Sequence, residues 1–448
     1  MEREKDGKFI QGTAITFISG ILSFLLGIPA SVILARMLGP EGRGIYALAM
    51  LLPTMIVTLG NLGIGPATVF YIARGDFRRQ EIFGNDALLS LFIGGSGVLV
   101  GLVVVFFFRQ AVFPGVSLNY LLIALTLVPL ELFFSYVNCI LLGAQRIKEY
   151  NYVQIIQSVL FLAFIAFALL GAKGDVTGAV LAGIFSWLIV NIIVFILAKR
   201  IADGIILKPN KTYIKKAAAY GAQAHLANIL GFLNYRIDMF MVNIFLDPAA
   251  VGLYAIAVGL IEKIWMVSHS ASTVLFPRIA AEREEERQKD FTPLVARTVL
   301  WTTAIGALVL ALLSRWIILF LFSEAFLPAV GALRALIIGV IMLSAGRVLA
   351  NDLAGRGFPR LNIYTGLAAV VTNVALNSIW IPRYGIVGAA WASTASYSVT
   401  FLLALFFYCR ISGNRWTKVI LPQPGDLSLY YGIANRSIRW MRKKLRRG

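Results

Sequence analysis

The first residues that could do chemistry are two charges inside a long apolar stretch. The segment "NYRID" (234–238) places Arg236 and Asp238 between "HLANILGFL" and "MFMVNIFL". A charged side chain in hydrocarbon is costly, so an intramembrane charge is by default a functional hypothesis. Positions i and i+2 of a helix point in nearly opposite directions, so these two residues should not pair with each other. Each is therefore predicted to find its partner on another helix, in water or in a ligand.

Two further cations lie within apolar segments of the second half of the chain. Lys263 is near the middle of its segment, where its ammonium cannot easily reach the headgroups, and Arg347 is in the inner half of another. Adjacent helix positions face different directions, so Lys263 should not pair with its neighbour Glu262. Basic groups in a wet cavity suit an anion, and arginine can bind a phosphate through two parallel hydrogen bonds. Arg236, Lys263 and Arg347 are the predicted substrate-binding residues.

The acids within apolar segments form a second group of candidates. Asp238 could orient helix packing or couple transport to an ion, and either H⁺ or Na⁺ would serve. The other candidates for coupling or for structural pairing are Glu262, Glu131 and Asp86. Asp86 also lies close enough to the end of its segment to be merely interfacial.

The composition identifies the elements that must position these charges. Of 448 residues, 59% are hydrophobic and only 14% are charged, whereas soluble domains carry about 25% charged residues. Runs of about 20 apolar residues recur along the chain, each long enough to cross a bilayer. A transmembrane β-barrel would instead show short alternating segments. The sequence predicts an all-α, multi-pass protein of the cell membrane, and its first apolar stretch is interpreted as a retained span rather than a signal peptide.

Hydropathy and turn signals predict about twelve spans. Their approximate ranges are 10–36, 44–72, 83–108, 117–143, 150–171, 176–198, 216–246, 249–277, 293–320, 328–353, 359–381 and 385–409. The net charge is +19. Connections rich in Lys and Arg alternate with poorer ones, and the rich set falls on the side of the N-terminus. Lys and Arg collect in cytoplasmic loops, so both termini are predicted to be cytoplasmic. The same rule explains the positive charge without a nucleic-acid partner.

The chain contains an internal repeat. The segment "ARMLGPEGRGIYALAMLL" (35–52) matches "NIFLDPAAVGLYAIAVGL" (243–260) at a shift of about 208, and 176–187 matches 386–397 at nearly the same shift. Related halves of parallel topology indicate two helical bundles with the substrate between them. We expect six-helix lobes at 1–204 and 205–410. Residues 411–448 form a basic tail, which is predicted to lie as an amphipathic helix on the anionic inner leaflet.

Several segments resemble one known family at this point. "LARMLGPEGRGIYALAMLLP", "NYRIDMFMVNIFLDPAAVGLYAIA", "VLFPRIAAE" and residues 351–397 are similar, in that order, to the polysaccharide biosynthesis and lipid-linked oligosaccharide flippases. These flippases belong to the multidrug/oligosaccharidyl-lipid/polysaccharide (MOP) exporter superfamily. The resemblance implies two six-helix lobes around a cavity that opens alternately to each side. It also implies that the cargo is an undecaprenyl- or dolichyl-linked saccharide, which moves from the inner to the outer leaflet.

The resemblance leaves rival functions open. A cation-coupled multidrug exporter of the same superfamily typically carries an aspartate in its first span, but residues 10–36 contain no acid. A membrane enzyme acting on lipid-linked sugars would need larger outer loops and paired catalytic groups. A passive scaffold would not need the internal charges. The expected partners are a polyprenyl-linked saccharide and membrane lipids, with the chain acting as a monomer.

No cofactor or metal is expected. The chain has only two cysteines, Cys139 and Cys409, and two histidines, His225 and His269. None of them has the spacing of a metal site or of a disulfide framework.

Overall fold

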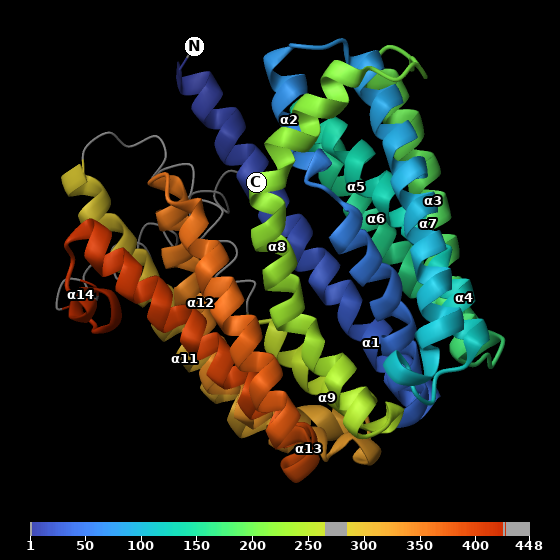
Figure 1. The fold of residues 1–448 in the computed structure, drawn as a ribbon, viewed down its shortest axis with the longest axis vertical. Coiled ribbons are helices and arrows are strands. Elements are labelled where there is room, and N and C mark those ends of the chain that lie inside the picture. The colour runs from blue at the N-terminus through green and yellow to red at the C-terminus, as the bar shows by residue number, and fades with distance from the viewer. Residues whose placement is uncertain (1, 265–284, 424–425, 427–448) are drawn as a thin grey trace, which may run out of the picture. The chain divides into compact units, whose positions relative to one another are not determined.

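The fold consists of helices. The computed structural model describes residues 2–264, 285–423 and 426, and within them every side chain except those of 2–14, 223–224 and 285–290. The α-helices are α1 Glu2–Gly60, α2 Ile64–Arg74, α3 Arg79–Val112, α4 Leu118–Leu125, α5 Leu127–Gly143, α6 Ile147–Ala166, α7 Val176–Ile201, α8 Lys211–Phe245, α9 Pro248–Glu262, α11 Glu285–Leu321, α12 Ala329–Gly355, α13 Pro359–Ser412 and α14 Trp416–Ile420. A π-turn (Phe167–Gly171) extends α6, and a 3₁₀ turn (Glu324–Phe326) precedes α12. Figure 1 shows the α-helices with these labels, coloured along the chain.

Eight helices of the described residues are long and apolar enough to cross a membrane. Two of these apolar stretches, in α1 and α13, run for 46 and 54 residues. About 20 residues span a bilayer, so each of the two is long enough for two crossings. The prediction of an all-α, multi-pass fold is confirmed. The count of twelve spans and the cytoplasmic placement of both termini stay predictions.

Glycines mark the places where the long helices change direction. Gly39 within α1 has φ 66°, and Gly385 within α13 has φ 59°. Only glycine adopts this left-handed region easily, and both positions fall at predicted span boundaries. The predicted span 44–72 is interrupted, however. Leu62 and Gly63 have positive φ between α1 and α2, and the Gly63 backbone lies directly against that of Gly221 in α8.

Side-chain caps fix the starts of three helices. The carboxylate of Asp175 accepts hydrogen bonds from the backbone at the start of α7, and the Asn210 side chain does the same for α8. Asp247 accepts from the Ala250 amide at 2.7 Å and is followed by Pro248, which suits the first helical position. Asp247 and Pro248 therefore separate α8 from α9 and fix where α9 begins.

The chain forms two compact units. Unit 1 comprises 1–263, 311–336 and 370–393, and unit 2 comprises 264–310, 337–369 and 394–448. Within unit 1, a buried apolar cluster from α1, α4, α6 and α7 includes Leu34, Tyr46 and Ile165. Within unit 2, a second cluster from α11 to α14 includes Val348 and Tyr408. Both units combine segments that are distant in the sequence, whereas the predicted lobes at 1–204 and 205–410 are consecutive halves of the chain. The two lobes stay a prediction.

Equivalent glycines of the internal repeat make reciprocal contacts inside unit 1. Helices α1 and α9 pack together. A Cβ atom at Gly44 would lie 1.6 Å from the carbonyl oxygen of Pro248, and one at Gly252 would lie 1.9 Å from that of Pro40. In the repeat, Pro40 corresponds to Pro248 and Gly44 to Gly252. Each glycine therefore admits the proline backbone of the other half, and we call these four residues the glycine–proline contact.

Within unit 2, an ion pair attaches Asp426, which follows α14, to α11. The guanidinium of Arg297 in α11 donates to both carboxylate oxygens of Asp426, at 2.6 and 2.5 Å. These hydrogen bonds hold the pKa of the Asp426 carboxyl below its usual range. A depressed pKa favours the folded state above the unfolded pKa of about 3.9, so this attachment should persist at neutral pH. It should weaken only as strong acid protonates Asp426.

Candidate functional site

Arg236 and Glu262 form an ion pair between α8 and α9. Nη1 of Arg236 lies 2.7 Å from Oε1 of Glu262, and Nη2 lies 3.3 Å from Oε2. The two side chains are 29% and 23% exposed, so the pair is only partly covered by protein. The expectation that Arg236 takes a partner from another helix, and not Asp238, is confirmed. The pair presents a guanidinium whose two nitrogens already match the geometry of a carboxylate, and hence that of a phosphate.

Lys263 follows Glu262 directly at the end of α9. Its side chain is exposed, and its ammonium lies 5.2 Å from the centre of the Phe24 ring of α1. Among the described residues no carboxylate lies within ion-pair distance of it. The fifteen residues of α9 separate it from the start of the helix at Pro248 by about 22 Å. An exposed ammonium within the hydrocarbon would require water or an anion, because lipid cannot solvate it.

Asp238 is fully buried in a network of hydroxyl groups. Its carboxylate accepts hydrogen bonds from the Tyr254 hydroxyl of α9 at 2.6 Å and from the Ser393 hydroxyl of α13 at 2.9 Å. The backbone amide of Met239 donates a third, at 2.8 Å. Three helices thus meet at one carboxyl group, an arrangement that can orient packing or hold a small cation.

Two buried asparagines also join α13 to α8. Asn373 and Asn377 are fully buried in α13, and the amide of Asn377 donates to the Asn373 carbonyl oxygen at 2.5 Å. Asn373 in turn donates to the backbone carbonyl of Asn234 at 3.3 Å. These asparagines link helices, which is the usual role of polar residues at helical spacing in membranes.

Asp86 lies in a second buried network, away from Asp238 in the sequence. Its carboxylate accepts hydrogen bonds from the hydroxyls of Thr68 in α2 and Tyr213 in α8, each at 2.7 Å. Asp86 and Thr68 are fully buried, and Tyr213 is 1% exposed. Asp86 therefore lies inside the protein rather than at the interface, and the network ties α2 and α3 to the start of α8.

We expect this network to stabilise the fold. Asp86→Leu would leave the Tyr213 hydroxyl without its strongest acceptor, and a buried unsatisfied polar group costs about 1–3 kcal/mol. Asp86→Asn keeps a carbonyl acceptor, and Tyr213→Phe removes only one donor, so both should cost less. Thermal unfolding of the purified variants measures the order. An Asp86→Leu variant as stable as the native protein would contradict the structural role.

The remaining predicted site residues lie elsewhere. Glu131 in α5 is half-buried, within electrostatic range of Tyr46, and no described residue forms a hydrogen bond or ion pair with it. Arg347 in α12 is half-buried and belongs to unit 2, whereas Arg236 and Lys263 belong to unit 1. Convergence of the three cations on one cavity stays a prediction. The tail predicted to bind the inner leaflet lies, from residue 427 onward, outside the described residues, and so does His269.

One contact within unit 1 had no counterpart in the sequence analysis. The guanidinium of Arg36 in α1 donates to the carbonyl oxygens of Leu321, at 2.8 Å, and of Phe320, at the end of α11. A cation at a helix C-terminus satisfies free carbonyls and the negative end of the helix dipole. Arg36 is the last residue of the predicted span 10–36, and no role was predicted for it from the sequence.

Comparisons with known proteins place the chain among membrane transporters. A family model described as polysaccharide biosynthesis protein matches residues 9–281, more than half of the chain. The chain is 22% identical to the probable low-salt glycan biosynthesis flippase Agl15 of Haloferax volcanii, over 86% of this chain and 80% of that protein.

Solved structures share the fold. A structure of the lipid II flippase MurJ in an inward closed conformation matches with a TM-score of 0.75 and 16% identity, over 88% of this chain and 87% of that one. An inward-facing multidrug resistance MATE family transporter of the MOP superfamily matches with a TM-score of 0.73 and 15% identity, over 87% and 94%. Because both kinds of transporter fit about equally well, the fold alone does not separate their cargoes.

Proposed function

The chain belongs to the polysaccharide biosynthesis protein family, in the flippase branch of the MOP superfamily, and we propose that it translocates an anionic lipid-linked saccharide across the membrane. The cargo would be a polyprenyl-pyrophosphate-linked oligosaccharide that moves from the inner to the outer leaflet. Alternating exposure of a central cavity to the two sides would carry it. The function is therefore transport and not an enzymatic reaction.

The observation that carries the proposal is the exposure of Lys263 without an acidic partner among the described residues. The residue lies at the end of α9, about 22 Å from the start of that helix. An ammonium facing lipid would be strongly unfavourable, so the proposal places it in a water-filled space. A pyrophosphate crossing the membrane needs such a cation, because an uncompensated anion would meet a large desolvation barrier.

The neighbouring ion pair supports the same cargo. The ion pair with Glu262 orients the Arg236 guanidinium, and 29% of the Arg236 side chain is exposed. An incoming pyrophosphate would compete with Glu262 for the two parallel hydrogen bonds, and Lys263 would add a charge that needs no fixed geometry. Arg347 is proposed to act nearer the cytoplasmic end of the path, as a later or earlier contact for the same anion.

Ion coupling would require an acid that no cation has already neutralised. Glu262 is held by Arg236, whereas hydroxyl groups hold Asp238 and Asp86. We propose Asp238 as the first candidate for H⁺ or Na⁺, because its network joins α8, α9 and α13. Glu131 and Asp86 follow. Asp86→Asn, which should spare the fold, also tests coupling, since lost transport in a stable variant would assign the ion to Asp86.

A multidrug exporter is the second candidate, favoured by the fold match alone. Its cargo is expected to be cationic, which does not suit a Lys263 that has no acidic partner among the described residues. Vesicles that contain the purified protein separate the two functions. We expect transfer of a labelled polyprenyl-pyrophosphate saccharide between leaflets and no export of a cationic dye. Dye export without saccharide transfer would overturn the proposal.

A further inference from the structure

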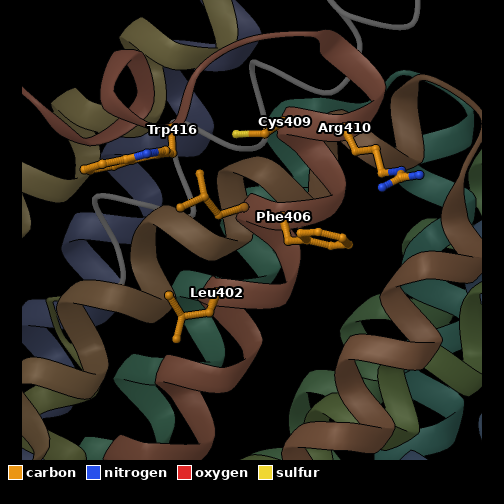
Figure 2. A pocket seen from close by; sticks show the side chains of 6 residues that line it. Leu402, Phe406, Cys409, Arg410 and Trp416 are labelled. Atoms are coloured by element: carbon orange, nitrogen blue, oxygen red, sulfur yellow. The ribbon is translucent and has the colours of Figure 1, made fainter.

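An open groove in unit 2 lies along the last turns of α13. Leu402, Leu405, Phe406, Cys409 and Arg410 line it together with Trp416 of α14, and its volume is about 430 Å³ (Figure 2). That volume falls within the range of small-ligand sites, about 300–1,000 Å³. None of these residues belongs to the proposed cargo site, so a ligand of the groove would be distinct from the cargo.

Apolar side chains of α13 line most of the groove, and Arg410 lies at one end of it. Its α13 residues recur at spacings of three and four and therefore share one face of the helix. Over eight residues this face runs for about 12 Å. Leu402 and Phe406 are 58% and 55% exposed, so the apolar part is open to the bilayer. Arg410 lies in the last turn of α13, and in Figure 2 its side chain extends to the same side as the Phe406 ring.

The cations at this end have no protein partner in the described part of the chain. The side chain of Arg410 is exposed and forms no ion pair or hydrogen bond with a described residue. The same is true of the side chain of Arg415, which directly precedes the groove-lining Trp416. Arg410 does complement the negative end of the α13 dipole. That interaction leaves the donors of its guanidinium free, and a guanidinium suits the two oxygens of a phosphate.

Trp416 indicates that this end of the groove lies at the membrane surface. Its side chain is 56% exposed, and tryptophan gathers at the boundary between hydrocarbon and headgroups. An occupant must therefore offer an apolar chain along α13 and an anion at the level of Arg410. We propose that the groove binds one anionic glycerophospholipid, with its phosphate on Arg410 and Arg415 and an acyl chain along Leu402 and Phe406.

Other occupants fit less well. The chain beyond residue 426 reads "ANRSIRWMRKKLRRG" near its end and carries the same sign of charge as Arg410 and Arg415. A second copy of the chain would need about 20–30 residues on each side, far more than six. A zwitterionic lipid brings its own cation beside the phosphate, which weakens the attraction to two arginines.

Native mass spectrometry of the full chain, titrated with phosphatidylglycerol or phosphatidylcholine, tests the site. Each interfacial cation should favour the anionic lipid about fivefold. We expect tighter binding of phosphatidylglycerol to the native protein, and a loss of about fivefold in Arg410→Gln and again in Arg415→Gln. Arg383→Gln, which changes an exposed arginine elsewhere on α13, is the matched control and should bind like the native protein. Glycerol phosphate, which lacks acyl chains, should not compete.

A second readout uses the native groove without altering its cations. In a Cys139→Ser protein, Cys409 is the remaining thiol of the chain, and bound lipid should slow its reaction with a maleimide. Phosphatidylglycerol should protect Cys409 more than phosphatidylcholine does. Equal binding and equal protection by the two lipids, competition by glycerol phosphate, or a second protein copy in place of lipid would each overturn the proposal. None of these outcomes bears on transport of the saccharide, so the two proposals fail separately.

Discussion

Replacement of Lys263 by alanine should slow translocation of the lipid-linked saccharide by about 10- to 100-fold, while thermal stability stays unchanged. The magnitude is that of one hydrogen bond to a charged group, about 1.5–3 kcal/mol. Stability should hold because Lys263 is exposed and no described acid would be stranded by its removal. The measurement pairs initial transport rates in vesicles with thermal unfolding of the same purified protein.

Three variants control this result. Lys263→Arg keeps the charge and should retain most of the rate, and Lys208→Ala, in the connection before α8, should change neither quantity. Arg236→Ala should lose both transport and some stability, because it leaves Glu262 only 23% exposed and without its partner. If Lys263→Ala lowered stability and left transport intact, the residue would be structural and the cargo assignment would lose its support.

Alanine at Gly252 should destabilise the protein through the glycine–proline contact. Its Cβ would lie 1.9 Å from the Pro40 carbonyl oxygen, so α1 and α9 would have to move apart. Overpacking of this kind typically costs about 1–3 kcal/mol. Gly44→Ala should act alike, since its Cβ would lie 1.6 Å from the Pro248 carbonyl oxygen. Thermal unfolding in one detergent measures the loss.

The same helices supply controls for the alanine variants. A Cβ at Gly259 in α9 or at Gly27 in α1 would meet no atom within 4 Å. Gly259→Ala and Gly27→Ala should therefore be neutral or slightly stabilising, because alanine favours helix over glycine. The double variant Gly44→Ala with Gly252→Ala should cost less than the sum of its parts, since one separation relieves both overlaps. Alanine at Gly252 without any loss relative to Gly259→Ala would refute the close contact.

Local chemistry made much of the fold predictable. The bends at Gly39 and Gly385 fall at predicted span boundaries because glycine and proline interrupt helices by their own geometry. The break at 61–63 lies in "GNLGIGP" (60–66), whose glycines and proline are helix-breaking signals that the hydropathy-based span 44–72 did not use. That the Gly63 backbone lies against Gly221 of a distant helix is not visible in the sequence. The repeat likewise pairs Pro40 with Pro248 and Gly44 with Gly252 in sequence, but only the tertiary structure shows that each glycine contacts the proline of the other half.

The sequence predicted which charged residues form the candidate site, but not which residues they pair with. Helical geometry alone separates Arg236 from Asp238, and the structure bears this out. That Glu262 is the partner depends on how α8 and α9 pack, which no local pattern specifies. The hydroxyls of Tyr254 and Ser393, which hold Asp238, gave no signal because such residues are common in membrane helices.

The most direct test of the cargo compares two lipid-linked saccharides that differ only in the linking group. One carries the pyrophosphate, and the other joins the same sugar to the same polyprenol through a neutral linkage. The native protein in vesicles should translocate the pyrophosphate form faster, and Lys263→Ala should remove most of that preference while leaving the neutral form at its native rate. Equal rates for both forms in the native protein, or a preference untouched by Lys263→Ala, would contradict the assignment of these cations to an anionic cargo.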